Sequence, residues 1–267
     1  MIIEPLRQER KMSSYLEEKP RRVLIVFWHG VGDVVQFMGI FHYLKLKYTA
    51  THFDIGFQRG LDEETFYPGA VLLDNLDNIE EGYDFTFLIH FPVEVEGLTK
   101  SELCCIEELG ILPMSGYKKI WTQFESRLCA VHFNLTCLPD LVVPEREVAE
   151  RIWNDILAAG WIPIEVHFQH IYHNPVNEKF DFVDCTVRRC VPRIATLLGL
   201  IQRCGAFIGV VSGPFHCAMA TLPHDRIAYL EKEIPVRRFT YEPIKTFNVK
   251  DYQGGITEWL KTAEGES

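Results

Sequence analysis

The residues best suited to chemistry in this 267-residue chain lie in two short turns that contain glycine. The first turn, 29–33, follows an apolar run and contains His29, Gly30, Gly32 and Asp33. Its two glycines allow the backbone to approach a ligand closely, and the helix expected after the turn offers free N–H groups. Asp33 falls in the first turn of that helix, where a carboxylate can also serve only as a cap that complements the helix dipole.

The second turn, Ser212-Gly213-Pro214, follows another apolar run, 206–211, and precedes a stretch of small residues. Ser212 can cap the helix expected here, and Pro214 fits its start because the N–H that proline lacks is not needed there. The N–H groups that remain open form a phosphate site with the helix dipole behind it. A buried helix with a good cap would carry the same residues, so the turn by itself is compatible with both interpretations.

Both turns need parallel strands to position them. The chain alternates apolar, β-branched runs with helical patterns, which indicates a doubly wound α/β fold whose ligands bind at the carboxyl ends of the strands. The pattern restarts near the middle of the chain, which predicts a polar leader at 1–20, an N-terminal domain at 21–122 and a C-terminal domain at 123–267. Strands are expected at 23–27, 53–57, 85–89, 128–133, 161–168, 206–211 and 226–230, and helices at 34–48, 144–159, 192–204 and 255–262.

Composition and charge exclude several classes of protein. With 47% hydrophobic and 24% charged residues, the chain has the composition of a globular protein rather than a disordered one. The net charge is −10, and the segment 62–108 carries thirteen acidic residues against one lysine, which argues against general nucleic-acid binding. No apolar run is long enough to span a bilayer, and the first 22 residues lack the apolar core of a signal peptide. We therefore expect a cytoplasmic protein with no transmembrane segment, whose eight cysteines are free thiols.

Metal binding is not expected. His167, His170 and His173 recur every third residue near the end of a predicted strand, so neighbouring members of the series would face opposite sides. The cysteines also lack the paired C-x₂-C spacing of a structural zinc site.

Taken together, the two turns resemble glycosyltransferase family 9, the ADP-heptose:lipopolysaccharide heptosyltransferases. Residues 22–48, RVLIVFWHGVGDVVQFMGIFHYLKLKY, are similar to the family's amino-terminal motif, in which a strand leads into a turn ending Gly-Asp-Val. Residues 197–223, LLGLIQRCGAFIGVVSGPFHCAMATLP, are similar to its second signature, which contains Ser-Gly-Pro-x-His. The resemblance implies the GT-B fold, in which two Rossmann-like domains face a cleft. It also implies a metal-independent, inverting transfer of a sugar from a nucleotide-sugar to an acceptor hydroxyl, without a cofactor.

The resemblance also implies roles for individual residues. Asp33 matches the carboxylate that acts as general base on the acceptor hydroxyl of a glycan or other acceptor, and the turn before it, with His29, Gly30 and Gly32, lies on the acceptor side. The C-terminal domain binds the nucleotide-sugar. The residues assigned to donor binding are Ser212, Gly213, Pro214, Phe215 and His216, together with Asn134 and Thr136.

Two positions depart from the family's pattern. Val211 replaces the acid that precedes Ser-Gly, and no basic residue lies between Phe133 and Arg146, where the family carries a lysine that helps neutralise the diphosphate. Since a guanidinium group suits phosphate oxygens, our hypothesis is that Arg237 or Arg238 contacts the diphosphate instead. The same departures favour an alternative, a non-catalytic protein on this fold that binds sugar nucleotides or acts as a scaffold. A second alternative is an epimerase that acts on UDP-sugars.

Overall fold

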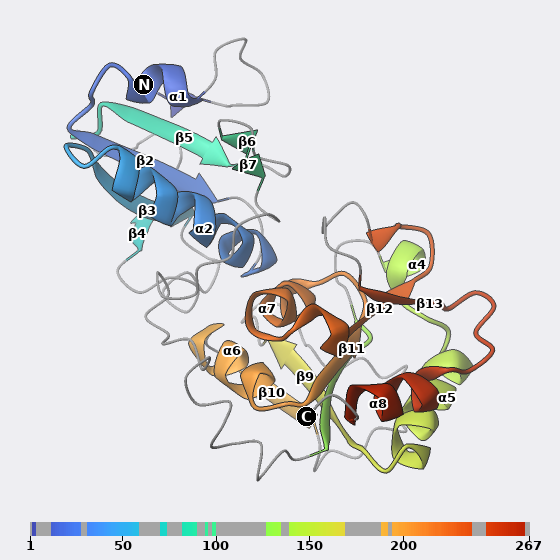
Figure 1. Ribbon diagram of the computed structural model, residues 1–267. Helices are drawn as coiled ribbons and strands as arrows, with labels where there is room; N and C mark the ends of the chain where they lie inside the picture. The colour runs from blue at the N-terminus through green and yellow to red at the C-terminus, as the bar shows by residue number, and fades with distance from the viewer. Residues whose placement is uncertain are drawn as a thin grey trace. The chain divides into compact units, whose positions relative to one another are not determined.

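The computed structural model consists of two compact units (Figure 1). Unit 1 comprises Met1–Ile111 and His170–Tyr172, and unit 2 comprises Leu112–Gln169 and His173–Ser267. The sequence predicted the division between residues 122 and 123. The structure describes residues 2–3, 12–27, 31–58, 70–73, 82–89, 94–95, 98–99, 127–134, 139–168, 188–191, 194–236 and 244–264.

Unit 1 is built on a five-stranded parallel sheet in the order β1-β5-β2-β3-β4. From β2 in the middle, the chain moves outward to β3 and β4 on one side and then crosses to β5 on the other side. The strands are β1 (Ile2–Ile3), β2 (Arg22–Phe27), β3 (His52–Gln58), β4 (Val71–Leu73) and β5 (Phe85–Ile89), and the helices are α1 (Met12–Leu16) and α2 (Val31–Lys47). A separate antiparallel pair joins β6 (Glu94–Val95) to β7 (Leu98–Thr99).

Helix α2 packs on one face of this sheet through aromatic contacts (Figure 1). The ring of Phe27 on β2 lies edge-on to Phe37 of α2, with centroids 5.3 Å apart, and stacks on Phe57 of β3 at 5.8 Å. Phe41, one turn further along α2, meets Phe53 of β3 edge-on at 6.4 Å. These contacts fix the start of α2 at the carboxyl end of β2, which is where the first turn was predicted.

Residues 2–3 and 12–20, from the stretch that was predicted to be a polar leader, pack on the sheet of unit 1. Strand β1 pairs in parallel with β5, and α1 buries Tyr15 and Leu16. The ring of Tyr15 lies edge-on to Phe85 at 5.4 Å and to Phe87 at 5.9 Å. A few apolar side chains in a mostly polar stretch are enough for this docking, because β5 offers them both a free edge and an aromatic surface.

Unit 2 is a six-stranded parallel sheet in the order β10-β9-β8-β11-β12-β13. Numbered along the unit, this is the 3-2-1-4-5-6 order of the Rossmann fold. The strands are β8 (Leu128–His132), β9 (Ile162–Phe168), β10 (Arg188–Val191), β11 (Ala206–Gly209), β12 (Ile227–Glu231) and β13 (Lys245–Asn248). The helices are α4 (Pro139–Val142), α5 (Arg146–Ala158), α6 (Ile194–Gln202), α7 (Gly213–Thr221) and α8 (Ile256–Glu264), with a 3₁₀ turn at His224–Arg226.

The predicted central strands are confirmed, and the strands that the sequence missed lie at the sheet edges. β4, β10 and β13 are each at the border of a sheet and pair with one neighbour only. Edge strands need few apolar residues: β10 opens with two arginines, and β13 buries Phe247 alone. Hydrophobic runs therefore identify the buried middle of a parallel sheet better than its borders.

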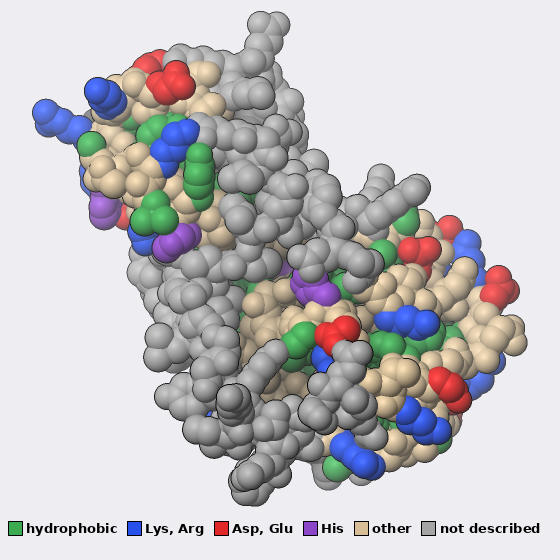
Figure 2. All heavy atoms as spheres, viewed as in Figure 1, with side chains coloured by type: hydrophobic (Ala, Val, Ile, Leu, Met, Phe, Trp, Pro, Cys, Tyr) green, Lys and Arg blue, Asp and Glu red, His purple; other side chains and the backbone are tan. Residues whose placement is uncertain are grey.

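Two further observations concern possible partners. None of the described helices is long and apolar enough to cross a membrane. On the face drawn in Figure 2, the described Lys and Arg side chains of unit 2 are interspersed with Asp and Glu. The described part of that face therefore offers no extended basic surface to a polyanion.

Candidate functional site

The second turn lies at the topological switch point of the unit 2 sheet. From β8 the chain proceeds to β9 and β10 on one side, and β11 then lies against the other side of β8. In open α/β sheets, ligands bind outside the carboxyl ends of the two strands where the order reverses. The two strands here are β8, followed by Phe133 and Asn134, and β11, followed by Val210, Val211 and Ser212.

Ser212 caps helix α7, as predicted. Its backbone is extended, and its Oγ accepts a hydrogen bond from the Phe215 N–H at 3.4 Å while donating to the Val210 carbonyl at 3.1 Å. The helix begins at Gly213, and Pro214 occupies its first turn, where the missing N–H costs no intrahelical bond. The turn is therefore rigid, with a helix N-terminus directed toward the switch point.

Gly209, the last residue of β11, leaves no room for a side chain beside the end of β8. The Val210 N–H donates to the His132 carbonyl at 3.0 Å, which ties the ends of β8 and β11 together. A Cβ atom built on Gly209 would lie 2.8 Å from that carbonyl oxygen and 2.8 Å from Cζ of Phe207. The glycine is thus required by packing between the two strands that flank the site.

Of the remaining donor-site residues, two can be placed. Asn134 is partly buried and directly follows the end of β8, next to the switch point. His216 lies in the first part of α7, is 8% exposed, and its ring meets Phe215 edge-on at 5.3 Å. Thr136 lies outside the described residues.

The two arginines predicted to contact the diphosphate, Arg237 and Arg238, both lie outside the described residues. Lys232 lies in the same segment after β12, and its side chain is bound to other residues of unit 2. Its ammonium group donates to the Val143 carbonyl at 3.0 Å and pairs with the Glu145 carboxylate at 3.2 Å. Lys232 therefore holds the segment that precedes α5 against the end of β12.

The first turn lies at the corresponding point of unit 1. Here the order reverses between β2 and β5, and the turn follows β2. Helix α2 begins at Val31, so Gly32 and Asp33 fall in its first turn, as expected. The side chain of Asp33 lies outside the described residues, as do His29 and Gly30. Both predicted turns thus occupy the switch point of their own Rossmann-like sheet.

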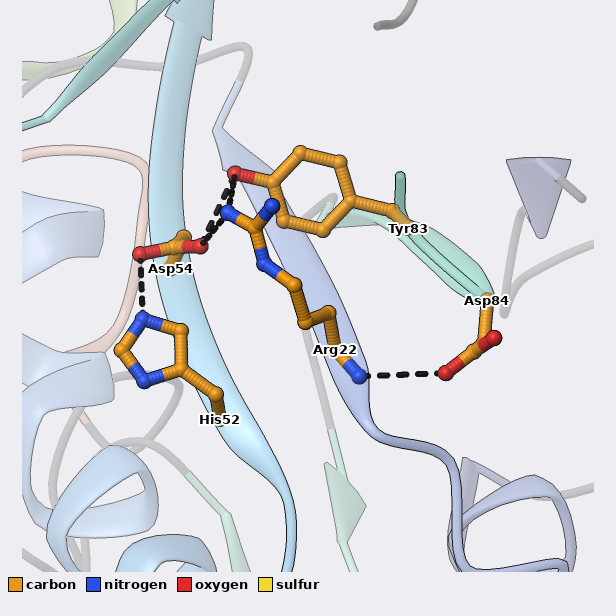
Figure 3. A network of polar contacts seen from close by, with 5 residues as sticks. All are labelled: Arg22, His52, Asp54, Tyr83 and Asp84. Atoms are coloured by element: carbon orange, nitrogen blue, oxygen red, sulfur yellow. Dashed lines mark hydrogen bonds and ion pairs between the residues drawn. The ribbon is translucent and has the colours of Figure 1, made fainter. Parts of the chain in front are cut away.

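A polar network at the opposite, amino-terminal edge of the unit 1 sheet has a different character (Figure 3). The Asp54 carboxylate accepts hydrogen bonds from Arg22 at 2.9 Å and from the Tyr83 hydroxyl at 2.9 Å, and His52 lies 3.1 Å from its other oxygen. Burial acts to raise the pKa of Asp54, but the bonds from Tyr83 and Arg22 outweigh it and hold the pKa below its usual value. The Asp84 carboxylate accepts the Arg22 N–H at 3.1 Å. The network fastens β2, β3 and the entry to β5 together, away from the carboxyl ends where the site lies.

In the part of the chain that the structure describes, no group of three His, Cys, Asp or Glu side chains could hold a metal ion. The side chains of His167, His170 and His173 lie outside it. The described cysteines, Cys129, Cys204 and Cys217, are buried thiols that are not in disulfides.

Comparison with known proteins bears on the fold of the whole chain. No protein-family model matches the sequence, and no curated protein matches it. Among solved structures, the ADP-heptose LPS heptosyltransferase II of E. coli superposes with a TM-score of 0.59 at 13% identity, covering 92% of this chain and 100% of that one. The chain has the GT-B fold. The resemblance inferred from the two turns is thereby confirmed at the level of the fold.

Two further solved structures are similar to this chain over nearly its whole length. A family 9 glycosyltransferase of Veillonella parvula matches with a TM-score of 0.54 at 13% identity, covering 92% of this chain and 98% of that one. The E. coli heptosyltransferase WaaC, in a structure with ADP, matches with a TM-score of 0.53 at 10% identity, covering 92% and 97%. The likeness spans nearly the whole of each chain, so it includes both Rossmann-like units.

The sequence analysis did not single out His132, the last residue of β8, which is next to the switch point. It is 6% exposed at the end of β8, and its Nδ1 lies 2.7 Å from the Val166 carbonyl of β9. A carbonyl oxygen only accepts, so Nδ1 carries the proton. The only local signal was a histidine that ends a buried parallel strand.

Proposed function

We propose that this protein is a glycosyltransferase that moves a sugar from a nucleotide-sugar to an acceptor hydroxyl. The observation that carries the proposal is the placement of both predicted turns. Each lies at the switch point of one Rossmann-like sheet, in a chain whose GT-B fold is that of heptosyltransferases over nearly its full length. Switch points are the ligand-binding positions of such sheets, so the two units supply two binding positions, one for each substrate.

The donor is assigned to unit 2. Backbone N–H groups at the start of α7, and the helix dipole behind them, suit the diphosphate of a nucleotide-sugar. As the bond between the anomeric carbon and the diphosphate oxygen breaks, negative charge develops on the leaving group, and fixed N–H donors stabilise it. The cap formed by Ser212 holds these donors in place before the substrate arrives.

The acceptor is assigned to unit 1, with Asp33 as the general base. The carboxylate takes the proton of the acceptor hydroxyl while the oxygen attacks the anomeric carbon on the side opposite to the leaving group, which inverts the configuration. The proton ends on Asp33, and the electron pair of the broken bond ends on the nucleoside diphosphate. Helix N-termini and arginines can stabilise this charge, so the proposed transfer is metal-independent.

The first test is a thermal-shift screen of the full chain against ADP-, GDP-, UDP- and CMP-sugars, since a ligand of the folded state raises the melting temperature. With the sugar nucleotide that binds, Asp33→Asn should lower turnover by roughly 10²–10⁴-fold while leaving the affinity for the donor nearly unchanged. Loss of donor binding in the folded variant would assign Asp33 to the donor site instead.

One observation favours the alternative of a non-catalytic binding protein. Lys232, which is described in the segment that was expected to supply a cation, is bonded to Val143 and Glu145. Replacing Arg237 and Arg238 separately by Ala and measuring the affinity for a nucleoside diphosphate distinguishes the two functions. A loss of about 1.5–3 kcal/mol in one variant supports the transferase, and unchanged affinity in both favours the non-catalytic protein.

A further inference from the structure

We propose that Gln36 binds hydroxyl groups of a neutral sugar acceptor beside Asp33. This inference rests on the proposed function, because it adds a residue to the acceptor position of unit 1 and names the chemical class of the acceptor. The observation behind it is a buried amide in the second turn of α2 that has no hydrogen-bond partner among the described residues.

Gln36 is a polar residue in apolar surroundings. It is 3% exposed, and its neighbours Val35 and Phe37 are fully buried. Buried polar side chains are nearly always hydrogen-bonded, because an amide that loses its contacts with water and gains no replacement destabilises the folded state. Within the part of the chain that the structure describes, no hydrogen bond is made to the Gln36 amide. The amide therefore suits a partner from outside the chain.

The Gln36 amide is nevertheless not sealed from solvent. Nε1 of Trp161 is a nitrogen that is completely covered and also lacks a partner, and the Gln36 amide does not belong to this class. Since the amide has no partner and is not completely covered, a small part of it stays open to solvent. A side chain that is mostly buried, with an open polar tip, is typical of the wall of a binding position.

The geometry of α2 directs this side chain toward the first turn of the helix. Phe37 and Phe41 pack on the sheet, so Gln36, which lies about 100° around the helix from Phe37, is on a flank of α2. Side chains in a helix lean toward its N-terminus, and residues three or four apart share a face. Gln36 thus shares a face with Gly32 and Asp33, at the end of α2 that follows the carboxyl end of β2.

An amide in this position suits an uncharged ligand that is rich in hydroxyl groups. Its oxygen accepts hydrogen bonds and its NH₂ group donates two, while a sugar hydroxyl both donates and accepts. One side chain can thus hold two neighbouring hydroxyls while Asp33 takes the proton of a third. A cation in the same position would stabilise the ionised carboxylate and make it a weaker base. The neutral amide orients the acceptor without this loss.

Gln36→Met separates a contact with the acceptor from a structural role. Methionine has a similar length, is unbranched and favours helices, but its thioether is only a weak acceptor. If the amide has no partner within the protein, the variant should keep the melting temperature or raise it slightly. If the amide is bonded within the protein, the melting temperature should fall. The matched control is Gln202→Met, which makes the same change at the last residue of α6 in the other unit.

The experiment uses the full chain, the sugar nucleotide that raises its melting temperature, and the methyl glycosides of glucose, galactose and mannose as acceptor probes. An NMR titration measures the binding of each glycoside, and release of the nucleotide measures turnover. For the glycoside that binds, we expect Gln36→Met to lower its affinity, and kcat/KM where it is turned over, about 3- to 10-fold. The affinity for the sugar nucleotide should stay the same. Gln202→Met should match the original protein in every measurement.

Each other outcome overturns the proposal in a distinct way. Equal affinity for the glycoside in a folded Gln36→Met variant would remove the role of Gln36 and leave the proposed function intact. A melting temperature several degrees lower, or failure to fold, would show that the amide is bonded within the protein. A loss of affinity for the sugar nucleotide alone would assign Gln36 to the donor.

The original protein provides the test that separates this inference from the proposed function. If a sugar nucleotide binds and none of the three glycosides does, the inference fails and the donor site of the proposed function stands. If neither a sugar nucleotide nor a glycoside binds, both fail.

Discussion

The lack of room for a side chain at Gly209 makes Gly209→Ala an informative substitution. The added Cβ would lie 2.8 Å from the His132 carbonyl oxygen and 2.8 Å from Cζ of Phe207, whereas non-bonded carbons prefer about 3.5–4.0 Å. The carbonyl belongs to the neighbouring strand and cannot turn away. Phe207 is fully buried and packs against Phe215, so its ring has no free space to enter.

These contacts set the expected magnitude. Forcing an extra methyl group into a packed core costs about 1–3 kcal/mol, and two rigid neighbours place this site at the upper end of that range. Alanine recovers about 0.5–1 kcal/mol relative to glycine, because it loses less conformational freedom on folding. We therefore expect a net loss of about 2 kcal/mol, or a fall in melting temperature of roughly 4–8 °C. Because Gly209 borders the switch point, the affinity for a nucleotide-sugar should fall as well.

Gly199→Ala is the matched control, because it makes the same chemical change in the middle of α6. Apart from its chain neighbours and the backbone of its own helix, a Cβ on Gly199 meets no described atom within 4 Å, so alanine should stabilise this helix by about 0.5–1 kcal/mol. The assay is urea denaturation followed by circular dichroism, with both variants measured beside the original protein. Opposite signs support the packing argument. A Gly209→Ala variant that is as stable as Gly199→Ala would refute it.

Three further predictions concern stability and reactivity. Asp54→Asn should lower the melting temperature at neutral pH, because the Asp54 carboxylate has a lowered pKa in the folded state. Protonation removes this contribution, so the difference between the two proteins should shrink as the pH falls below about 4, and a constant difference from about pH 7 to pH 3 would contradict this. Tyr252→Phe removes the hydroxyl that donates to Asp155 at 2.5 Å, and should lower the free energy of unfolding in urea by about 1.5–3 kcal/mol; an unchanged midpoint would show that this bond contributes nothing. Burial raises the pKa of Cys204 to about 12, so its thiol should resist a thiol-specific reagent at about pH 8 until the protein unfolds, and rapid labelling of the native protein would disprove this.

The parts of the molecule predicted from sequence alone are those whose signals are local. Residues 23–27 and 206–211 are apolar runs because strands in the middle of a parallel sheet are buried on both faces. Ser212 and Pro214 mark the start of a helix because the cap and the missing N–H act within one turn. Such features are encoded by neighbouring residues, so both turns and their order along the chain could be read without coordinates.

Other features depend on residues far apart in the sequence, and only the tertiary structure determined them. Strand β13 has little apolar character and exists because β12 offers it a free edge. Lys232 follows β12 in a segment expected to bind phosphate, yet it binds Glu145, which lies 87 residues earlier in the chain. His132 looks like any strand residue in the sequence, and only the structure shows that its Nδ1 bonds to the Val166 carbonyl of the neighbouring strand. Each of these results from strand order and register, which no local pattern encodes because the pairing partners are separated by whole helices.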